Sequence, residues 1–212
     1  MGGIEEKTQV WTNLELRQFL YAVRDDRLYP LWLTLAMTGL RRGEALALRW
    51  TDVDLERARV SVRRSLVPIN GMVEVHEPKT SRGRRLVALD PFTVSVIRAW
   101  SRRQKEERLE SGPAWTDSGL VFTRPDGQLI HPERVSKAFR AIVKKTGLTQ
   151  IHLHDLRHTH ATLALAAGVH PKVVSDRLGH ATVAITLDIY SHVIPALSEE
   201  AAATVAALVM GE

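Results

Sequence analysis

The sequence contains no cysteine among its 212 residues. This absence excludes disulfide bonds, thiolate metal sites and a cysteine nucleophile, and it is compatible with a cytosolic protein. No apolar run approaches the roughly 20 residues that a membrane-spanning helix needs, so we expect no such helix. The first residues, MGGIEEKTQ, are polar and acidic, which argues against a signal peptide.

Tyrosine is scarce as well, with three residues in the chain. Tyr21 and Tyr29 lie in the first two predicted helices, where no basic motif surrounds them. Tyr190 instead follows a segment that contains a histidine. It is either an ordinary half-buried side chain or a reactive one, and the motifs around it are needed to distinguish the two.

The charge is moderately positive, because 29 lysines and arginines outnumber 24 acidic residues and give a net charge of +5. The basic residues are unevenly spread, with one cluster in residues 63–85 and a second in residues 102–105. Clustered basic residues are expected where a protein contacts a phosphate backbone. A solvated surface produces the same pattern, so charge alone leaves both interpretations open.

Capping signals and periodicity predict a mainly helical protein with a small three-stranded antiparallel sheet. The alternating segments 59–63, 72–75 and 85–89 are the predicted strands, and Lys79 would lie in the hairpin loop between the last two. The apolar tail helix would pack on its own core or on a neighbouring subunit. The predicted helices span about 13–24, 30–38, 44–48, 91–109, 132–145, 155–167, 171–178, 182–192 and 197–209.

Four segments carry residues that indicate chemistry. They are TGLRRGEALALRW (38–50), PKTSRGRR (78–85), HDLRHTHAT (154–162) and LGHATVAITLDIYSHV (178–193). In this order they resemble the tyrosine recombinase family, which includes phage integrases and bacterial chromosome-dimer resolvases. The similarity extends from about Trp11 to Val193 and implies the catalytic core fold of the DNA breaking-rejoining enzymes.

The chemistry of such a reaction fits these residue types. Reversible cleavage of a phosphodiester needs a nucleophile that stores the bond energy as a covalent ester, and a tyrosine phenolate can attack and later leave. Arginine matches the phosphate oxygens bidentately and is permanently charged. A further acid must protonate the departing 5′ oxygen, because an alkoxide is a poor leaving group.

The resemblance implies a role for each matching position, in a reaction that uses no metal or nucleotide cofactor and passes through a 3′-phosphotyrosyl intermediate. Six positions are catalytic in type: Arg41 and Arg157 as phosphate clamps, Lys79 as general acid, His154 as acid or base near the tyrosine, His180 as donor to a non-bridging oxygen, and Tyr190 as nucleophile. His154 and Arg157 are three residues apart, so on a helix they share a face.

Other positions have supporting roles. Glu44 matches an acidic position that supports the arginine, and His158 is expected to support the catalytic residues. The T-G-x-R spacing favours Arg41 over its neighbour Arg42 as the clamp. The loop arginines, which are expected to contact the DNA backbone, are Arg82, Arg84 and Arg85. A plain backbone contact is also the alternative role for Lys79.

A zinc site is the rival interpretation of the histidines. Four of them, His152, His154, His158 and His160, fall within nine residues, and two are four residues apart, a spacing that can bind zinc on a helix. However, the sequence has no H-E-x-x-H motif and no cysteine, and Asp155 is the one evident carboxylate nearby. The resemblance already accounts for His154.

We expect residues 1–11 to be disordered or derived from cloning, and residues 12–212 to form the catalytic domain without the N-terminal core-binding domain of full-length relatives. The expected partner is double-stranded DNA, bound by a homotetramer that is monomeric in solution, with no membrane partner. The resemblance implies a bacterial or phage-encoded cytoplasmic protein that joins the nucleoid on DNA. Two alternatives are a DNA-binding module that does not cut and a relaxing enzyme like type IB topoisomerases.

Overall fold

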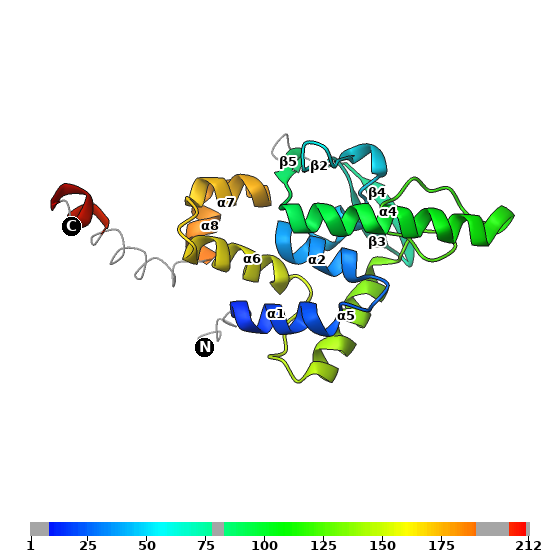
Figure 1. Ribbon diagram of the computed structural model, residues 1–212, viewed down its shortest axis with the longest axis horizontal. Coiled ribbons are helices and arrows are strands. Elements are labelled where there is room, and N and C mark those ends of the chain that lie inside the picture. Colours follow the sequence, from blue (N-terminus) through cyan, green and yellow to red (C-terminus); the bar gives the residue numbers. More distant parts are fainter. Residues whose placement is uncertain (1–8, 78–82, 190–203, 211–212) are drawn as a thin grey trace.

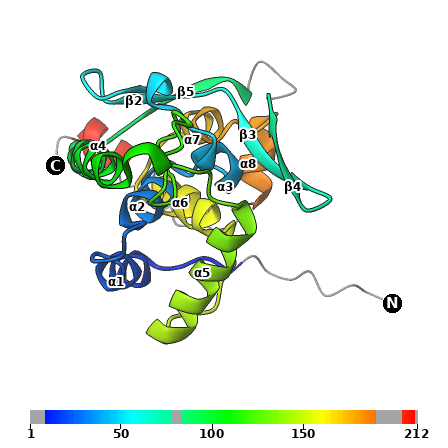
Figure 2. The same cartoon turned by 90° about the vertical axis from the view of Figure 1, so that its right-hand side faces the viewer.

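A computed structural model describes residues 9–77, 83–189 and 204–210. Most of the described residues form helices, with two small antiparallel sheets along one side (Figures 1 and 2). The α-helices are α1 (Asn13–Ala22), α2 (Tyr29–Thr38), α3 (Arg42–Leu46), α4 (Pro91–Ser111), α5 (Pro132–Thr146), α6 (Asp155–Ala166), α7 (Pro171–Leu178) and α8 (Val183–Ile189). The strands are β1 (Val53–Asp54), β2 (Arg59–Val62), β3 (Ser65–Ile69), β4 (Met72–His76) and β5 (Arg85–Ala88), and 3₁₀ turns span Trp50–Asp52 and Gly112–Ala114.

The helix boundaries follow local signals that are visible in the sequence. Thr12 accepts a hydrogen bond from the backbone N–H of Glu15, whose carboxylate accepts one in return, so the predicted capping box is confirmed. Asp90 caps α4 by accepting from the backbone N–H of Thr93 at 2.9 Å. Gly39 ends α2 in the left-handed conformation with φ +65°, which favours glycine.

An aromatic cluster holds α1, α2 and α5 together. Phe19 of α1 lies between Trp11, at a centroid distance of 5.2 Å, and Phe139 of α5, at 5.3 Å. Trp32 of α2 completes the cluster at 6.4 Å from Phe19. Trp11 also donates from its indole to the carbonyl of Thr149 at 2.8 Å, which satisfies its buried polar atom. The same core continues from these helices to the sheets, where it includes Val60 and Val87.

One of the three strands predicted for the sheet does not belong to it. A three-stranded antiparallel sheet exists, but its order is β1-β2-β5, with Val60 opposite both Val53 and Val87. The predicted strand 72–75 pairs instead with β3 in a separate hairpin, in which Leu66 lies opposite Val75. Pro68 inside β3 masks that strand in the sequence, because proline lacks the N–H that a ladder needs.

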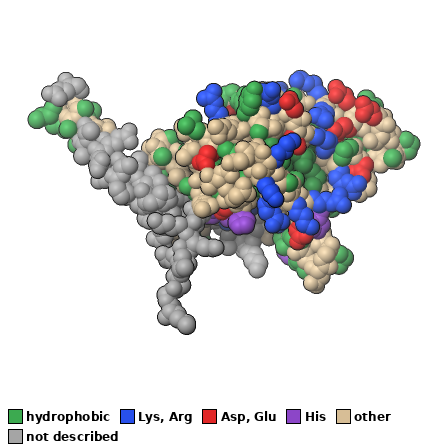
Figure 3. All heavy atoms as spheres, turned by 90° about the horizontal axis from the view of Figure 1, so that it is seen from below, with side chains coloured by type: hydrophobic (Ala, Val, Ile, Leu, Met, Phe, Trp, Pro, Cys, Tyr) green, Lys and Arg blue, Asp and Glu red, His purple; other side chains and the backbone are tan. Residues whose placement is uncertain are grey.

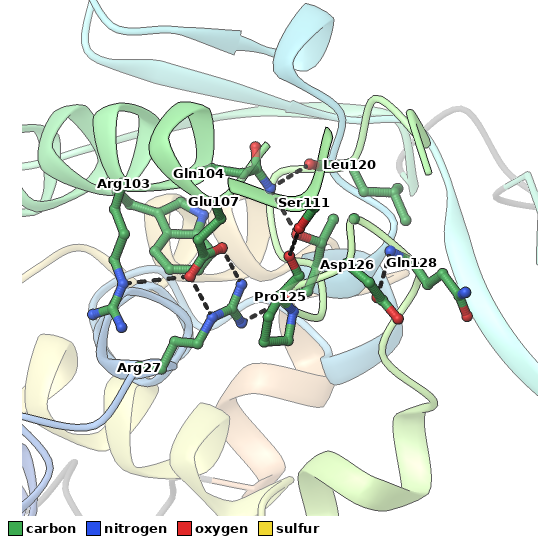
Figure 4. Close-up of polar contacts among 12 residues, drawn as sticks. Arg27, Arg103, Gln104, Glu107, Ser111, Leu120, Pro125, Asp126 and Gln128 are labelled. Atoms are coloured by element: carbon green, nitrogen blue, oxygen red, sulfur yellow. Dashed lines mark hydrogen bonds and ion pairs between the residues drawn. The ribbon is translucent and has the colours of Figure 1, made fainter. Parts of the chain in front are cut away.

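The connection between α4 and α5 is fixed onto α4 by side-chain hydrogen bonds. The Gln104 amide donates to the carbonyl of Val121 at 3.1 Å and to the hydroxyl of Thr123 at 2.8 Å. Glu107 accepts two hydrogen bonds from Arg27, at 2.7 and 2.5 Å (Figure 4). This polar cluster lies apart from the cavities described below and attaches the long helix to the body of the protein.

A second, smaller apolar cluster joins α6 to α7 through Ala161, Leu165, Val174 and Leu178. Of the predicted tail helix, residues 204–210 are helical and expose apolar side chains, with Leu208 at 83%. Residues 190–203 lie outside the described residues. None of the helices in the described part of the chain is both long and apolar enough to cross a membrane.

Candidate active site

A cavity of about 330 Å³ gathers four of the six catalytic-type residues that the sequence singled out. Its lining comes from the turn before α3, from the start of α6, and from the junction of α7 with α8. The residues that line it are Arg41, His154, Arg157, His158, Gly179, His180, Ala181 and Ile185. Segments more than a hundred positions apart in the chain therefore meet around one space of a size suited to a phosphate group and its neighbours.

Arg157 is the most enclosed of these residues, with 3% of its surface exposed. Its Nη1 donates to the carbonyl of Gly39 and its Nη2 to the carbonyl of Leu178, both at 2.8 Å. These carbonyls belong to the C-terminal ends of α2 and α7, which carry partial negative charge and so stabilise a cation. Because both acceptors are uncharged, they orient the guanidinium without cancelling its positive charge.

Arg41 and Arg42 point to different partners. Arg41 caps α3, and its Nη1 donates to Oε1 of Glu44 at 3.0 Å while its backbone N–H donates to Oε2 at 2.8 Å. Its side chain is 44% exposed and borders the cavity. Arg42 donates instead to the hydroxyl of Ser136 on α5 at 2.6 Å. Arg41 therefore lines the cavity, whereas Arg42 is not among its lining residues.

Three histidines line the cavity, and the pKa of each is lowered. Burial is the main cause of the lowered pKa of His154, and the positive charge of Arg157 adds to it. Burial and then the neighbouring His154 lower the pKa of His158, whose ring lies 5.0 Å from that of His154 in an edge-to-face arrangement. A neutral imidazole can both donate and accept a hydrogen bond, which suits proton transfer at neutral pH.

His180 has the most strongly lowered pKa of the three, at about 4. Burial is the main cause, followed by the charges of Arg157 and Arg41. Its Nδ1 lies 2.9 Å from the hydroxyl of Thr186 in α8, and Gly179 before it ends α7 with φ +70°. The turn and the hydroxyl together aim the imidazole at the cavity.

His160, the fourth histidine of the α6 region, lies among the residues that support the cavity but does not line it. Its Nδ1 lies 3.0 Å from the carbonyl of Ala36, so Nδ1 carries the proton, and Nε2 accepts from Nε of Arg177 at 3.2 Å. Burial above all, with the charge of Arg177, lowers the pKa of His160 to about 4. Within the described ranges, no three histidine or acidic side chains are placed to hold a metal ion together.

One basic groove adjoins the cavity, and a second lies along the neighbouring sheet. One, of about 450 Å³, shares Arg41 and His154 with the cavity and adds Arg42, Arg140 and His152. The other, of about 580 Å³, lies along β2 and β5 and contains Arg63, Arg64, Arg84 and Arg85. Figure 3 shows lysine and arginine side chains gathered in a band beside histidines on one face. A concentration of positive charge of this kind attracts a polyanion.

The predicted loop arginines differ in their surroundings. Arg84 is 60% exposed and forms an ion pair with Glu77, which is compatible with a backbone contact. Arg85 points inward, with 7% of its side chain exposed, and pairs with Glu44. Its predicted role as a DNA-backbone contact is therefore wrong, because its guanidinium is already engaged in the interior. Arg82, Lys79 and Tyr190 lie outside the described residues, although Tyr190 follows α8 directly in the sequence.

Several residues of this region were not singled out from the sequence. Thr186, which contacts His180, lies within the 178–193 segment but was given no role there. Arg140 was detectable, because Lys137, Arg140 and Lys144 recur at helical spacing along α5. Arg177 could not be recognised from the sequence, because its partners His160 and Met37 come from other helices.

The chain is similar in sequence to known proteins over most of its length. The sequence profile of the phage integrase family matches residues 11–196. The chain is 32% identical over 204 residues to a XerC-like tyrosine recombinase of Caldanaerobacter subterraneus subsp. tengcongensis, which covers 91% of this chain and 52% of that protein. It is 31% identical over 199 residues to the ICEBs1 integrase of Bacillus subtilis, covering 93% and 54%. The chain thus spans about half the length of these relatives.

Solved structures share the fold. The XerA recombinase superimposes with a TM-score of 0.74 at 24% identity, covering 93% of this chain and 66% of that one. The Tn1549 transposon integrase, solved with transposon right end DNA, gives a TM-score of 0.78 at 21% identity and covers 94% and 69%. These likenesses establish a mainly helical fold with small antiparallel sheets, of the kind found in tyrosine recombinase catalytic domains.

Proposed function

The chain belongs to the phage integrase family, and on that premise we propose that it is the catalytic domain of a site-specific recombinase. It cleaves and rejoins DNA strands without a metal ion, through a 3′-phosphotyrosyl intermediate at Tyr190. The observation that carries this proposal is the cavity, in which Arg41, Arg157 and His180 converge with His154 from segments far apart in the chain. A merely structural set of arginines and histidines would have no reason to share one accessible space.

In the proposed cleavage step, the Tyr190 oxygen attacks phosphorus, the bond to the 5′ oxygen breaks, and a 3′-phosphotyrosyl ester forms. His154 accepts the proton from the tyrosine hydroxyl, a role that its lowered pKa supports because the imidazole is neutral at pH 7. Lys79 donates a proton to the 5′ oxygen as it leaves. Attack of a 5′ hydroxyl on the ester reverses each transfer and reseals the strand, so no bond energy is lost.

Arg41 and Arg157 balance the negative charge that grows on the equatorial oxygens in the transition state. Preoriented donors are worth most there, and the carbonyl contacts of Arg157 fix its guanidinium before DNA arrives. We assign the Thr186 hydroxyl as donor to Nδ1 of His180, which leaves the proton on Nε2 for a non-bridging oxygen. His158 supports His154 by edge-to-face ring contact.

The proposed partner is double-stranded DNA carrying a recombination site. The XerH recombinase has been crystallised bound to its difH substrate, and a lambda integrase fragment as a dimer bound to a core site. We further propose that this chain acts on DNA as a homotetramer that exchanges strands in pairs. We propose residues 12–212 as the catalytic half of a clamp whose other half corresponds to the part of the relatives that this chain does not match.

A covalent-trapping assay tests the proposal. The protein is mixed with nicked duplexes from candidate attachment sites in EDTA, quenched with SDS, and analysed for a protein–DNA adduct on a denaturing gel. We expect an adduct that resists EDTA and is absent with Tyr190→Phe. An adduct that survives this substitution would move the nucleophile elsewhere. A lack of adduct on DNA that the protein demonstrably binds, with the rest of the clamp supplied, would contradict the proposed function.

A further inference from the structure

Arg85 has an environment that the predicted surface role does not explain. Its Nη2 donates to Oε2 of Glu44 at 2.8 Å and its Nη1 to Oε1 at 3.1 Å. Its Nε donates to the carbonyl of Arg177, near the end of α7, at 2.7 Å. The two side chains of the ion pair are only 7% and 6% exposed. Such a bidentate interior pair fixes both partners, because a buried charge is costly unless it is matched.

The same carboxylate also holds Arg41. Glu44 accepts from Nη1 of Arg41 at 3.0 Å and from its backbone N–H at 2.8 Å. Burial by itself would raise the pKa of Glu44, but the hydrogen bonds and charge of Arg85, together with those of Arg41, outweigh it and lower that pKa. Glu44 is therefore an ionised carboxylate between two arginines, one enclosed in the interior and one 44% exposed beside the cavity.

The charges of these three residues add up to one positive charge. We infer that Arg85 is a positioning residue whose charge neutralises Glu44, so that the charge of Arg41 remains available for the scissile phosphate. This inference rests on the proposed function. Without Arg85, the Glu44 carboxylate would have Arg41 as its counter-ion, and the two would form a neutral pair beside the cavity. Arg85 also links β5 to α7, the helix that leads to His180.

The substitution Arg85→Met tests this role, because methionine fills a similar space without charge. We expect the Tyr190-dependent adduct to form about 100-fold more slowly, the order of loss that a displaced catalytic group produces. The double variant Glu44→Gln/Arg85→Met should recover most of that rate, since it removes the negative charge that captures Arg41. Simple damage to packing would instead leave the double variant as slow as the single one, or slower.

A charge-specific readout separates this role from a general structural one. A DNA substrate with a neutral methylphosphonate at the scissile position removes one of the negative charges that Arg41 would offset. We expect Arg85→Met to be slow on the phosphate and close to the wild type on the methylphosphonate. Equal losses on both substrates, or no loss on either, would overturn the inference.

The matched control is Arg27→Met. Arg27 also forms a bidentate pair with a largely buried carboxylate, that of Glu107, and donates to the carbonyl of Thr123 at 2.7 Å (Figure 4). Arg27 lines neither the cavity nor the two basic grooves. Its substitution should therefore lower stability without changing the ratio of the rates on the two substrates. If Arg85→Met fails to fold, Arg85→Lys carries the test. Lysine keeps the charge but not the bidentate geometry, so the adduct should form more slowly than in the wild type but well short of about 100-fold more slowly. A loss of about 100-fold contradicts the charge role.

Wild-type protein and Tyr190→Phe are measured first with the same DNA. These measurements use DNA that the protein binds, with the rest of the clamp supplied, so the absence of a Tyr190-dependent adduct in the wild type would refute the proposed function. An adduct in the wild type, combined with a normal rate in Arg85→Met, would refute only the role of Arg85. The two failures are therefore distinguishable in one series of gels.

Discussion

At the scale of single residues, the protein keeps His160 and His180 neutral by enclosing them among arginines. Burial, followed by the nearby guanidinium groups, lowers the pKa of each histidine from 6.5 to about 4. The unfolded chain binds a proton at these sites below pH 6.5, while the folded chain does not until about pH 4. Their contribution to stability is therefore complete above pH 6.5 and is lost as the pH falls toward 4.

We predict that the free energy of unfolding decreases between pH 7 and pH 5, and that His160→Gln weakens this dependence. Glutamine can still donate to the Ala36 carbonyl and accept from Arg177, but it does not titrate. Urea denaturation at several pH values measures both proteins. His152→Gln, at an exposed histidine, is the control and should retain the wild-type slope. Identical slopes for His160→Gln and the wild type would contradict the prediction.

The sequence predicts residues of this site when their role is fixed by short spacing. His154 and Arg157 meet because they lie one helical turn apart, and Arg41 meets Glu44 for the same reason. Arg85 was misplaced, because its partner Glu44 is 41 residues away and a cluster of arginines looks like a surface from the sequence. Long-range pairing of charges depends on the fold, which composition does not encode.

At the scale of elements, the end of α2 is packed so closely against α6 and α7 that a side chain at Gly39 would force its neighbours to shift. A Cβ on Gly39 would lie 2.5 Å from Cδ2 of Leu178 and 2.9 Å from Cδ2 of His160, and its φ of +65° disfavours other residues. The carbonyl of Gly39 also accepts from Arg157. The junction of α2, α6 and α7 thus sets the position of Arg157, one of the two proposed phosphate clamps.

We predict that Gly39→Ala costs about 2 to 4 kcal/mol of stability, from left-handed backbone strain and overpacking together. It should also slow adduct formation, because the acceptor of Arg157 moves. Gly168→Ala is the control, since its φ is +77° but nothing lies within 4 Å of the added Cβ. That variant should lose only about 1 kcal/mol in urea denaturation. Equal losses would show that packing at Gly39 is not limiting.

Helices were easier to predict than strands for a physical reason. A capping residue such as Thr12 or Asp90 and a stop such as Gly39 act within one turn, so the sequence records them locally. Strands need a partner, and the partner of β4 is β3, whose Pro68 conceals it. The predicted α1 also runs two residues too far, to 24, because helix ends fray and carry weak signals.

At the scale of the whole molecule, positive charge is concentrated where the cavity opens into its neighbouring groove and along β2 and β5. Arg140 lines the groove that shares Arg41 and His154 with the cavity, and Arg63 lines the groove along the sheet. Both are exposed, although Arg63 also forms a long ion pair, at 3.9 Å, with the buried carboxylate of Asp52. A DNA duplex that reaches the cavity would place phosphates near both grooves, and each neutralised phosphate releases counterions.

Binding of nonspecific duplex DNA should therefore weaken linearly on a log–log plot against salt, between about 50 and 200 mM. We predict that Arg63→Gln and Arg140→Gln each reduce the magnitude of that slope by about 1, because each removes one phosphate contact. Arg17→Gln makes the same change in net charge on α1, in neither groove, and should leave the slope unchanged. Fluorescence anisotropy measures all four proteins. If the salt slope falls by the same amount in all three variants, net charge rather than the two grooves governs DNA binding. The path of the duplex must then lie elsewhere on the protein.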